Sequence, residues 1–125
     1  MKERDGQSEE YTSDEDECLD VPLAVLVNGN SASASEIFAG AIKDFDAGTL
    51  VGTTTYGKGI VQNIYSLGDG TSFKLTSSEY FTPSGTNIHG VGIEPDVVVE
   101  YEVDEENSEA DNQLEKAIEI LGNGM

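Results

Sequence analysis

The chain contains few of the residues on which several common kinds of protein depend. Its single cysteine, Cys18, cannot form an internal disulfide, so the sequence offers no disulfide framework. Only 6 of its 125 residues are lysine or arginine, against 25 aspartates and glutamates, and the formal net charge is −19. Because such a chain repels phosphate backbones and anionic membrane surfaces, we expect no nucleic-acid partner.

Long apolar runs are also missing. No segment approaches the roughly 18 apolar residues that a membrane-spanning helix needs, and the start, MKERDGQSEE, lacks the apolar stretch of a signal peptide. The length allows one domain or part of a larger one. A start this polar is also what a piece excised from a longer protein would have.

The acidic residues concentrate in two runs, 9–20 and 100–111, which are typical of solvated linkers or loops. A calcium site at 14–17 is the alternative, but this run lacks the glycine turn and the spaced ligands of a hand-type loop. The composition therefore divides the chain into three parts. These are an acidic polar lead-in at 1–20, a core at 21–101, and an acidic linker with a C-terminal amphipathic helix at 102–125.

Apolar patterning in the first half of the core predicts a β-α-β unit. The continuous apolar run at 21–27 predicts a buried parallel strand. A helical stripe follows at 34–47, with Gly48 as its expected stop, and β-branched residues at 50–55 predict the returning strand.

The second half of the core predicts a hairpin, then a strand and a helix. We expect hairpin strands at 60–67 and 71–81 around a turn at 68–70, a last strand at 97–101, and an amphipathic helix around 114–121. The complete order favours an α/β domain with a helix on at least one face of its sheet.

A serine-rich loop at 28–36 is the first candidate for chemistry. Hydrolysis by serine needs a nearby base, donors for the oxyanion, and a turn that presents the hydroxyl; this loop enters a helix where backbone N–H groups are unpaired. Ser31, Ser33 and Ser35 are all candidates. The alternative is structural, because Ser33 followed by Glu36 fits a capping box, and serine at a helix start is more often a cap.

The base could be a histidine or a lysine. The single histidine, His89, lies in a glycine-rich loop and is expected to be an ordinary turn residue. Lys58 lies between Gly57 and Gly59, which allow the backbone to bend tightly. A lysine base must be neutral near pH 7, so this hypothesis requires a buried pocket around Lys58. The alternative is a solvated lysine in a polar loop.

An ordered series of segments resembles the peptidase core of the carboxyl-terminal processing (tail-specific) serine peptidase family. In order, they are VPLAVLVN, GNSASASEI, FAGAIKD, VGTTTYGKGIVQ, LGDGT, YFTPSG and HGVGIEPDVVVE, with a weaker echo in NQLEKAIEIL. The resemblance covers 21–100. It implies an α/β fold with a crotonase/ClpP-like ββα core, present here as a partial domain, and no metal or organic cofactor.

The resemblance also implies roles for individual residues. The family's nucleophile corresponds to Ser33, its base to Lys58, and its lysine-orienting amide to Gln62. A glutamine carbonyl suits this role, because it accepts from an ammonium without adding a charge. Along an extended strand Lys58 and Gln62 would lie about 13 Å apart, so we expect a bend at Gly59 or a bridging water. The backbone N–H of Ala34 is the expected oxyanion donor.

The expected function is therefore that of a serine endopeptidase core that forms an acyl-enzyme at Ser33 and cleaves proteins near their C-terminal tails. The family's upstream oxyanion loop and its PDZ module are not found here, which favours a fragment that is inactive in isolation. In such a fragment exposed strand edges favour dimerisation or strand exchange.

The resemblance further implies polypeptide substrates with accessible C-termini. It also implies a place outside the cytoplasm, in the periplasm, at the cell surface or associated with a membrane. The alternative function is a non-catalytic binding or structural module of the same fold.

Overall fold

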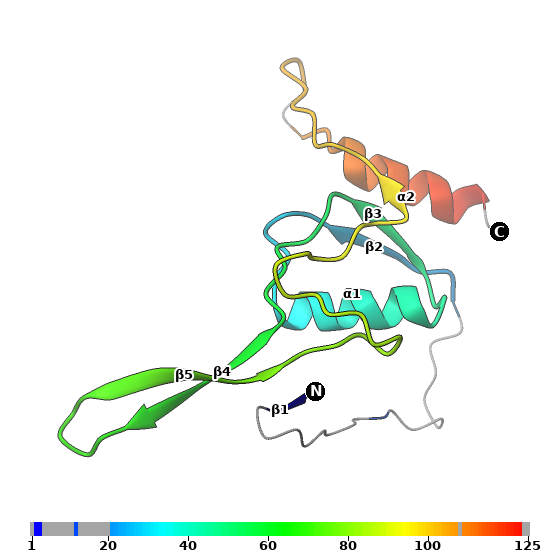
Figure 1. Cartoon of the computed structure of the whole chain (residues 1–125). Coiled ribbons are helices and arrows are strands. Elements are labelled where there is room, and N and C mark those ends of the chain that lie inside the picture. The colour runs from blue at the N-terminus through cyan, green and yellow to red at the C-terminus, as the bar shows by residue number, and fades with distance from the viewer. Residues whose placement is uncertain (1, 4–11, 13–20, 108, 124–125) are drawn as a thin grey trace.

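The structure is a computed structural model and describes residues 2–3, 12, 21–107 and 109–123 (Figure 1). Its elements are β1 (Lys2–Glu3), β2 (Ala24–Val27), α1 (Ala34–Asp44), β3 (Thr49–Gly52), β4 (Ile60–Ser66), β5 (Ser72–Glu79), β6 (Val97–Val98) and α2 (Asn112–Asn123). Cys18 and the calcium alternative at 14–17 lie outside the described residues.

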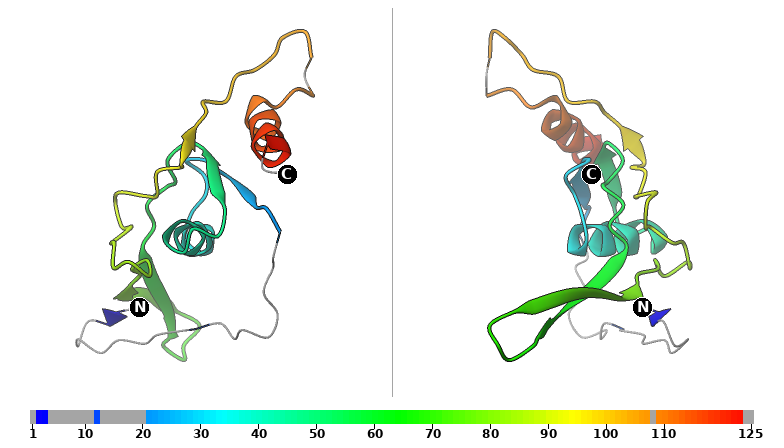
Figure 2. Two further views of the ribbon diagram at one scale, coloured as in Figure 1. Left: turned by 90° about the vertical axis from the view of Figure 1, so that its right-hand side faces the viewer. Right: turned by 60° about the vertical axis from the view of Figure 1, so that its left-hand side comes forward.

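A three-stranded parallel sheet with the order β2-β3-β6 forms the centre of the fold. Ala24 lies opposite Thr49, and Val51 lies opposite Val97. Helices α1 and α2 cover opposite faces of this sheet (Figure 2), so Leu50 and Val51 of the middle strand are 0% exposed. The parallel strand predicted at 21–27 is β2, but Leu26 in it is 42% exposed and Val27 is its buried residue. The strand that is buried on both faces is β3.

The strands are shorter than their apolar patterns predict. β3 ends at Gly52 and not at Thr55, because the Thr55 N–H donates to the carbonyl of Ile93 in a loop, at 3.1 Å. β6 is limited to Val97–Val98. Backbone groups beyond the ends of the strands thus form hydrogen bonds with loops. The side-chain pattern of the sequence does not predict these hydrogen bonds.

Helix α1 ends earlier than predicted, and Gly48 is not its stop. Phe45 is the C-cap, and Asp46 adopts the left-handed backbone conformation, with φ 52°. Gly48 serves close packing, since a Cβ there would lie 2.7 Å from the carbonyl oxygen of Leu23. The residue is glycine because two chain segments meet there.

Strands β4 and β5 form an antiparallel hairpin that extends away from the rest of the molecule (Figure 1). The predicted turn at 68–70 is confirmed, and the Leu67 N–H closes it by donating to the Thr71 carbonyl at 3.0 Å. The rings of Tyr65 and Phe73 stack across the strands with centroids 5.2 Å apart. β1 pairs with β5 at the end of the hairpin near the body.

The terminal amphipathic helix is confirmed as α2, which packs on β2 and β3. Its Ala117 is 5% exposed and lies on the buried side. Neither helix in the described part of the chain has the length and apolar character needed to cross a bilayer.

The close approach at Gly48 generates the first prediction. Gly48→Ala should lower the free energy of unfolding by roughly 1–3 kcal/mol, because the new methyl group meets backbone that cannot easily move. Gly122→Ala is the matched control, since a Cβ there meets nothing within 4 Å. It should leave stability unchanged or raise it by up to about 1 kcal/mol. Urea unfolding followed by circular dichroism measures both; equal stability of Gly48→Ala and the parent chain would contradict the packing role.

Candidate active site

Ser33 lies at a sharp turn between β2 and α1. Its backbone has φ 57° and ψ −112°, and Ser33 and Asp46 are the non-glycine residues with positive φ in the described chain. An ordinary N-cap is extended, whereas strained conformations of this kind cost about 1–3 kcal/mol and cluster at functional sites. The Ser33 N–H does donate to the Glu36 carboxylate at 2.9 Å, as in a capping box, but capping alone does not require this conformation. Strained strand-to-helix turns are known to present nucleophilic serines.

The neighbouring serines have other surroundings. Ser31 holds the loop together: its hydroxyl accepts from the Asn28 N–H at 3.1 Å, and its own N–H donates to the Asn28 carbonyl at 2.8 Å. Ser35 is exposed in the first turn of α1. Of the three candidates, the unusual backbone therefore singles out Ser33.

Glu36 is the buried centre of this region, with 0% exposure. No lysine or arginine of the described residues forms a salt bridge with it. Its carboxylate instead accepts four hydrogen bonds, from Ser33 N (2.9 Å) and Lys58 N (2.8 Å) on Oε2 and from Gly57 N (2.6 Å) and Thr55 Oγ1 (2.7 Å) on Oε1. The sequence predicts only the first of these bonds; the others come from a loop that local pattern does not connect to Glu36.

The ionised state of Glu36 is stabilised by these donors. Burial acts to raise the pKa of the carboxyl group, but the hydroxyl of Thr55 and the three backbone amides act in the other direction and hold the pKa below its ordinary value. The carboxylate is therefore charged at neutral pH although it is buried.

Glu36 brings Ser33 and Lys58 close together. The backbone N–H groups of both residues donate to the same oxygen, Oε2, so the two amides are neighbours in space although they are distant in sequence. A second link runs from the Tyr56 N–H to the Ser31 carbonyl, at 2.9 Å. The serine turn and the lysine loop are thus held together by backbone contacts at two points.

The glycines beside Lys58 allow its loop to pack against residues 88–92. Gly57 has φ 86°, and its carbonyl accepts from the Gly90 N–H at 2.9 Å. A Cβ on Gly59 would lie 2.6 Å from the backbone nitrogen of His89. The bend expected at Gly59 is not observed there; the irregularity is a β-bulge between Val61 and Gln62. Gly59 is needed for close contact and not for a bend.

The side chains of Lys58 and Gln62 do not meet in this structure. Lys58 is half-buried, and no described residue accepts a hydrogen bond from its ammonium group. Gln62 is exposed on β4, where its amide donates to the hydroxyl of Thr76 at 3.4 Å. The described residues therefore bring together Ser33 and the backbone of Lys58, but they do not bring Gln62 to the lysine.

The remaining predicted residues are exposed. Ala34 is the first residue of α1, and its N–H has no acceptor among the described residues, so it remains available to an oxyanion. His89 is exposed in a turn in which its N–H donates to the Asn87 side chain at 2.8 Å.

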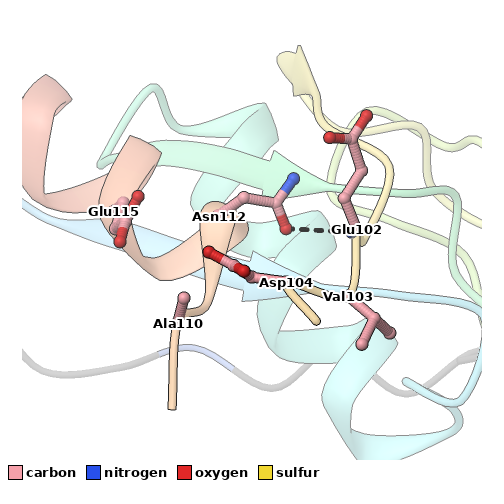
Figure 3. A pocket seen from close by; sticks show the side chains of 6 residues that line it. All are labelled: Glu102, Val103, Asp104, Ala110, Asn112 and Glu115. Atoms are coloured by element: carbon pink, nitrogen blue, oxygen red, sulfur yellow. Dashed lines mark hydrogen bonds between the residues drawn. The ribbon is translucent and has the colours of Figure 1, made fainter. Parts of the chain in front are cut away.

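Two hollows lie in the described part of the chain, and the second of them borders Asn28 of the serine-rich loop. One of about 300 Å³ lies at the start of α2 (Figure 3) and is lined by Glu102, Val103, Asp104, Ala110, Asn112 and Glu115. The other, of about 390 Å³, is lined by Asn28, Thr53, Glu100, Tyr101, Asp111 and Gln113. Neither includes Ser33 or Lys58, and no group of acidic, histidine or cysteine side chains within the described ranges has the arrangement of a metal site.

The chain is similar to known proteins over most of its length. The family that matches residues 1–99 is described as peptidase family S41. A carboxyl-terminal-processing protease of Synechocystis sp. is 43% identical over 125 residues, covering 98% of this chain and 29% of that protein. A carboxy-terminal-processing protease of Bartonella bacilliformis is 56% identical over 79 residues, covering 63% of this chain and 18% of that protein. The chain thus spans less than a third of these relatives.

Solved structures give the same result. The photosystem II D1 C-terminal processing protease superposes with a TM-score of 0.63 and 42% identity, over 81% of this chain and 25% of that one. The tricorn protease superposes with a TM-score of 0.62 and 28% identity, over 81% of this chain and 10% of that one. The predicted α/β class, as a partial domain, is confirmed.

The four hydrogen bonds of Glu36 generate the second prediction. Glu36→Gln should lower the free energy of unfolding at pH 7 by roughly 1–3 kcal/mol, because an amide nitrogen cannot accept from the buried donors that face it. The folded-state pKa of Glu36 is lowered, so its contribution is present above the ordinary value of 4.5 and is lost as pH falls through the folded-state pKa.

Urea unfolding over a series of pH values tests this prediction. The gap between the parent chain and Glu36→Gln should close on acidification. Glu94→Gln is the matched control, because Glu94 is exposed and its carboxylate accepts no hydrogen bond from a described residue. A gap that persists unchanged at low pH would show that the charge of Glu36 is not what stabilises the fold.

Proposed function

Because the chain belongs to peptidase family S41, we propose that it forms the part of a carboxyl-terminal processing serine protease that carries the nucleophile and the base. The observation that carries this proposal is the strained turn at Ser33, fixed to the backbone of Lys58 through one buried carboxylate. A turn of this kind positions a hydroxyl, and the lysine loop held beside it offers a candidate base.

The proposed reaction is acyl transfer through Ser33. The Ser33 Oγ attacks the carbonyl carbon of the scissile peptide while the neutral amine of Lys58 accepts the hydroxyl proton. The N–H of Ala34 donates to the oxyanion that forms. The carbon–nitrogen bond then breaks, Lys58 gives its proton to the leaving amine, and an ester on Ser33 remains. A water molecule hydrolyses this ester by the same sequence and restores the serine.

To act as the base and as the amide that orients it, Lys58 and Gln62 need surroundings that exclude more water. A neutral lysine needs desolvation, whereas Lys58 is half-buried in this chain. We assign Gln62 as the lysine-orienting amide, which requires β4 to turn its side chain from Thr76 toward Lys58. The bulge between Val61 and Gln62 is a place where such a change can occur. The relatives are much longer than this chain and have further segments with which to cover this region.

The proposed substrates are polypeptides that are cleaved near accessible C-termini. The names of two relatives describe carboxyl-terminal processing, and that of one structural neighbour describes processing of the D1 protein of photosystem II. We assign the general class and no particular substrate to this chain. From the same resemblance we propose that the parent protein acts outside the cytoplasm.

Substitution of the two central residues tests the proposal. Ser33→Ala and Lys58→Ala should each reduce cleavage of an unstructured polypeptide at least about a thousandfold, because nucleophile and base act as one unit. Ser35→Ala is the matched control, since Ser35 is an exposed serine of the same turn, and it should retain activity. The assay should compare this chain with a form extended upstream, using mass spectrometry of the products.

Two outcomes would contradict the assignment. Cleavage that persists in both Ser33→Ala and Lys58→Ala would exclude the proposed pair. Failure of both the chain and the extended form to cleave, while circular dichroism shows them folded, would favour a non-catalytic module of the same fold.

A further inference from the structure

Thr55 is a polar residue in the interior, only 5% exposed, between the end of β3 and the lysine loop. Its hydroxyl lies between two partners: it donates to Glu36 Oε1 at 2.7 Å and accepts from the Ile93 N–H at 2.8 Å. The backbone N–H of Thr55 also donates to the Ile93 carbonyl at 3.1 Å. Thr55 therefore joins the loop at 88–93 to the buried carboxylate.

The direction of the hydroxyl proton follows from these partners. A backbone N–H can only donate, so Ile93 occupies a lone pair of the threonine oxygen. The single proton of the hydroxyl is then free to point at the Glu36 carboxylate, which can only accept. A bond of this kind to a charged acceptor is stronger than one between neutral groups, and more so where water is excluded.

The loop at 88–93 is shaped to make this contact. Gly92 has φ 76°, and a Cβ on it would overlap the carbonyl oxygen of Thr55. Only glycine therefore allows the loop backbone to approach closely enough for Ile93 to reach the hydroxyl.

We propose that Thr55 is a positioning residue for the Ser33–Lys58 site, acting through Glu36. The two oxygens of Glu36 accept hydrogen bonds from different donors. Oε1 accepts from the Thr55 hydroxyl and the Gly57 N–H, and Oε2 accepts from the backbone N–H groups of Ser33 and Lys58. Loss of the hydroxyl leaves Oε1 with one donor, so the carboxylate gains freedom to rotate. The amides on Oε2 then lose their alignment.

The catalytic part of this inference depends on the function proposed above. The structural part does not, because it concerns the carboxylate and its donors alone. The experiment therefore needs readouts that do not require cleavage.

Three variants of the same chain separate the hydroxyl from the shape of the side chain. Thr55→Val keeps the shape and loses the hydroxyl, whereas Thr55→Ser keeps the hydroxyl and loses the methyl group. Thr54→Val is the matched control, since Thr54 is the exposed neighbour. The measurements are NMR titration of the Glu36 carboxyl carbon and hydrogen exchange of the Gly57 and Lys58 amides.

Thr55→Val should move the Glu36 titration to higher pH, because a donor to the charged form is lost. It should also speed exchange of both amides about tenfold, the effect of one charge-assisted hydrogen bond. Thr55→Ser and Thr54→Val should resemble the parent chain. The opposite pattern, with Thr55→Val like the parent and Thr55→Ser impaired, would show that the methyl group matters and would overturn the inference.

A measurement on the parent chain covers the case in which Thr55→Val does not fold. The Thr55 hydroxyl proton should exchange slowly enough with water to be observed by NMR, with a contact to the Ile93 N–H. Its rapid exchange would overturn the inference without any substitution.

Cleavage assays on the extended form separate this inference from the proposed function. If that form cleaves, Thr55→Val should lower kcat at least about tenfold with KM little changed, and Thr55→Ser should restore it. Full activity of Thr55→Val with an unchanged Glu36 titration would reject only the role of Thr55. If no form cleaves while the NMR changes occur as expected, the positioning of the two loops stands and the peptidase assignment fails.

Discussion

A buried carboxylate without a cation is the interaction on which the site depends. Isolated charges are costly to bury, and Glu36 is stabilised by four donors from two separate parts of the chain. Because each donor is a backbone amide or a fixed hydroxyl, the carboxylate in turn sets the distance between the serine turn and the lysine loop. A salt bridge to a flexible lysine would leave that distance free.

The strain at Ser33 follows from the same contact. A non-glycine residue keeps an unfavourable backbone conformation only where its surroundings determine it on several sides. Ser33 has β2 before it, α1 after it, and its own N–H bound to Glu36. Asp46 also has positive φ, but aspartate tolerates this region at a helix end. Positive φ therefore has a structural cause at Asp46, at the C-terminal end of α1, and indicates function at Ser33, at its N-terminal end.

Local sequence patterns predict the helices and strands of this fold. The roles of its polar and glycine residues depend on contacts between segments that are far apart in the sequence. The returning strand β3, the helix α1 and the turn at 68–70 follow from β-branched residues, an apolar stripe and turn residues. Gly48 and Gly59 are misread as a helix stop and a bend, because glycine is needed equally for turns and for close approach, and only the partner segment distinguishes them. For the same reason Glu36 is predicted as a cap, whereas three of its four donors come from a loop far along the chain.

The proposed nucleophile, Ser33, and the proposed base, Lys58, differ in how many of the contacts that each one needs are present in this chain. The serine turn, Glu36 and Thr55 all lie where the sheet, α1 and the loop at 88–93 meet, and the Glu36 carboxylate and the Thr55 hydroxyl both have hydrogen-bond partners there. Lys58 belongs to this framework through its backbone N–H, its ammonium group has no hydrogen-bond acceptor among the described residues, and Gln62 lies on the exposed hairpin. A hydroxyl can be positioned by backbone alone, whereas a neutral lysine also needs water excluded around it. The backbone geometry at Ser33 is therefore present in this chain, whereas the role proposed for Lys58 requires further cover around its side chain.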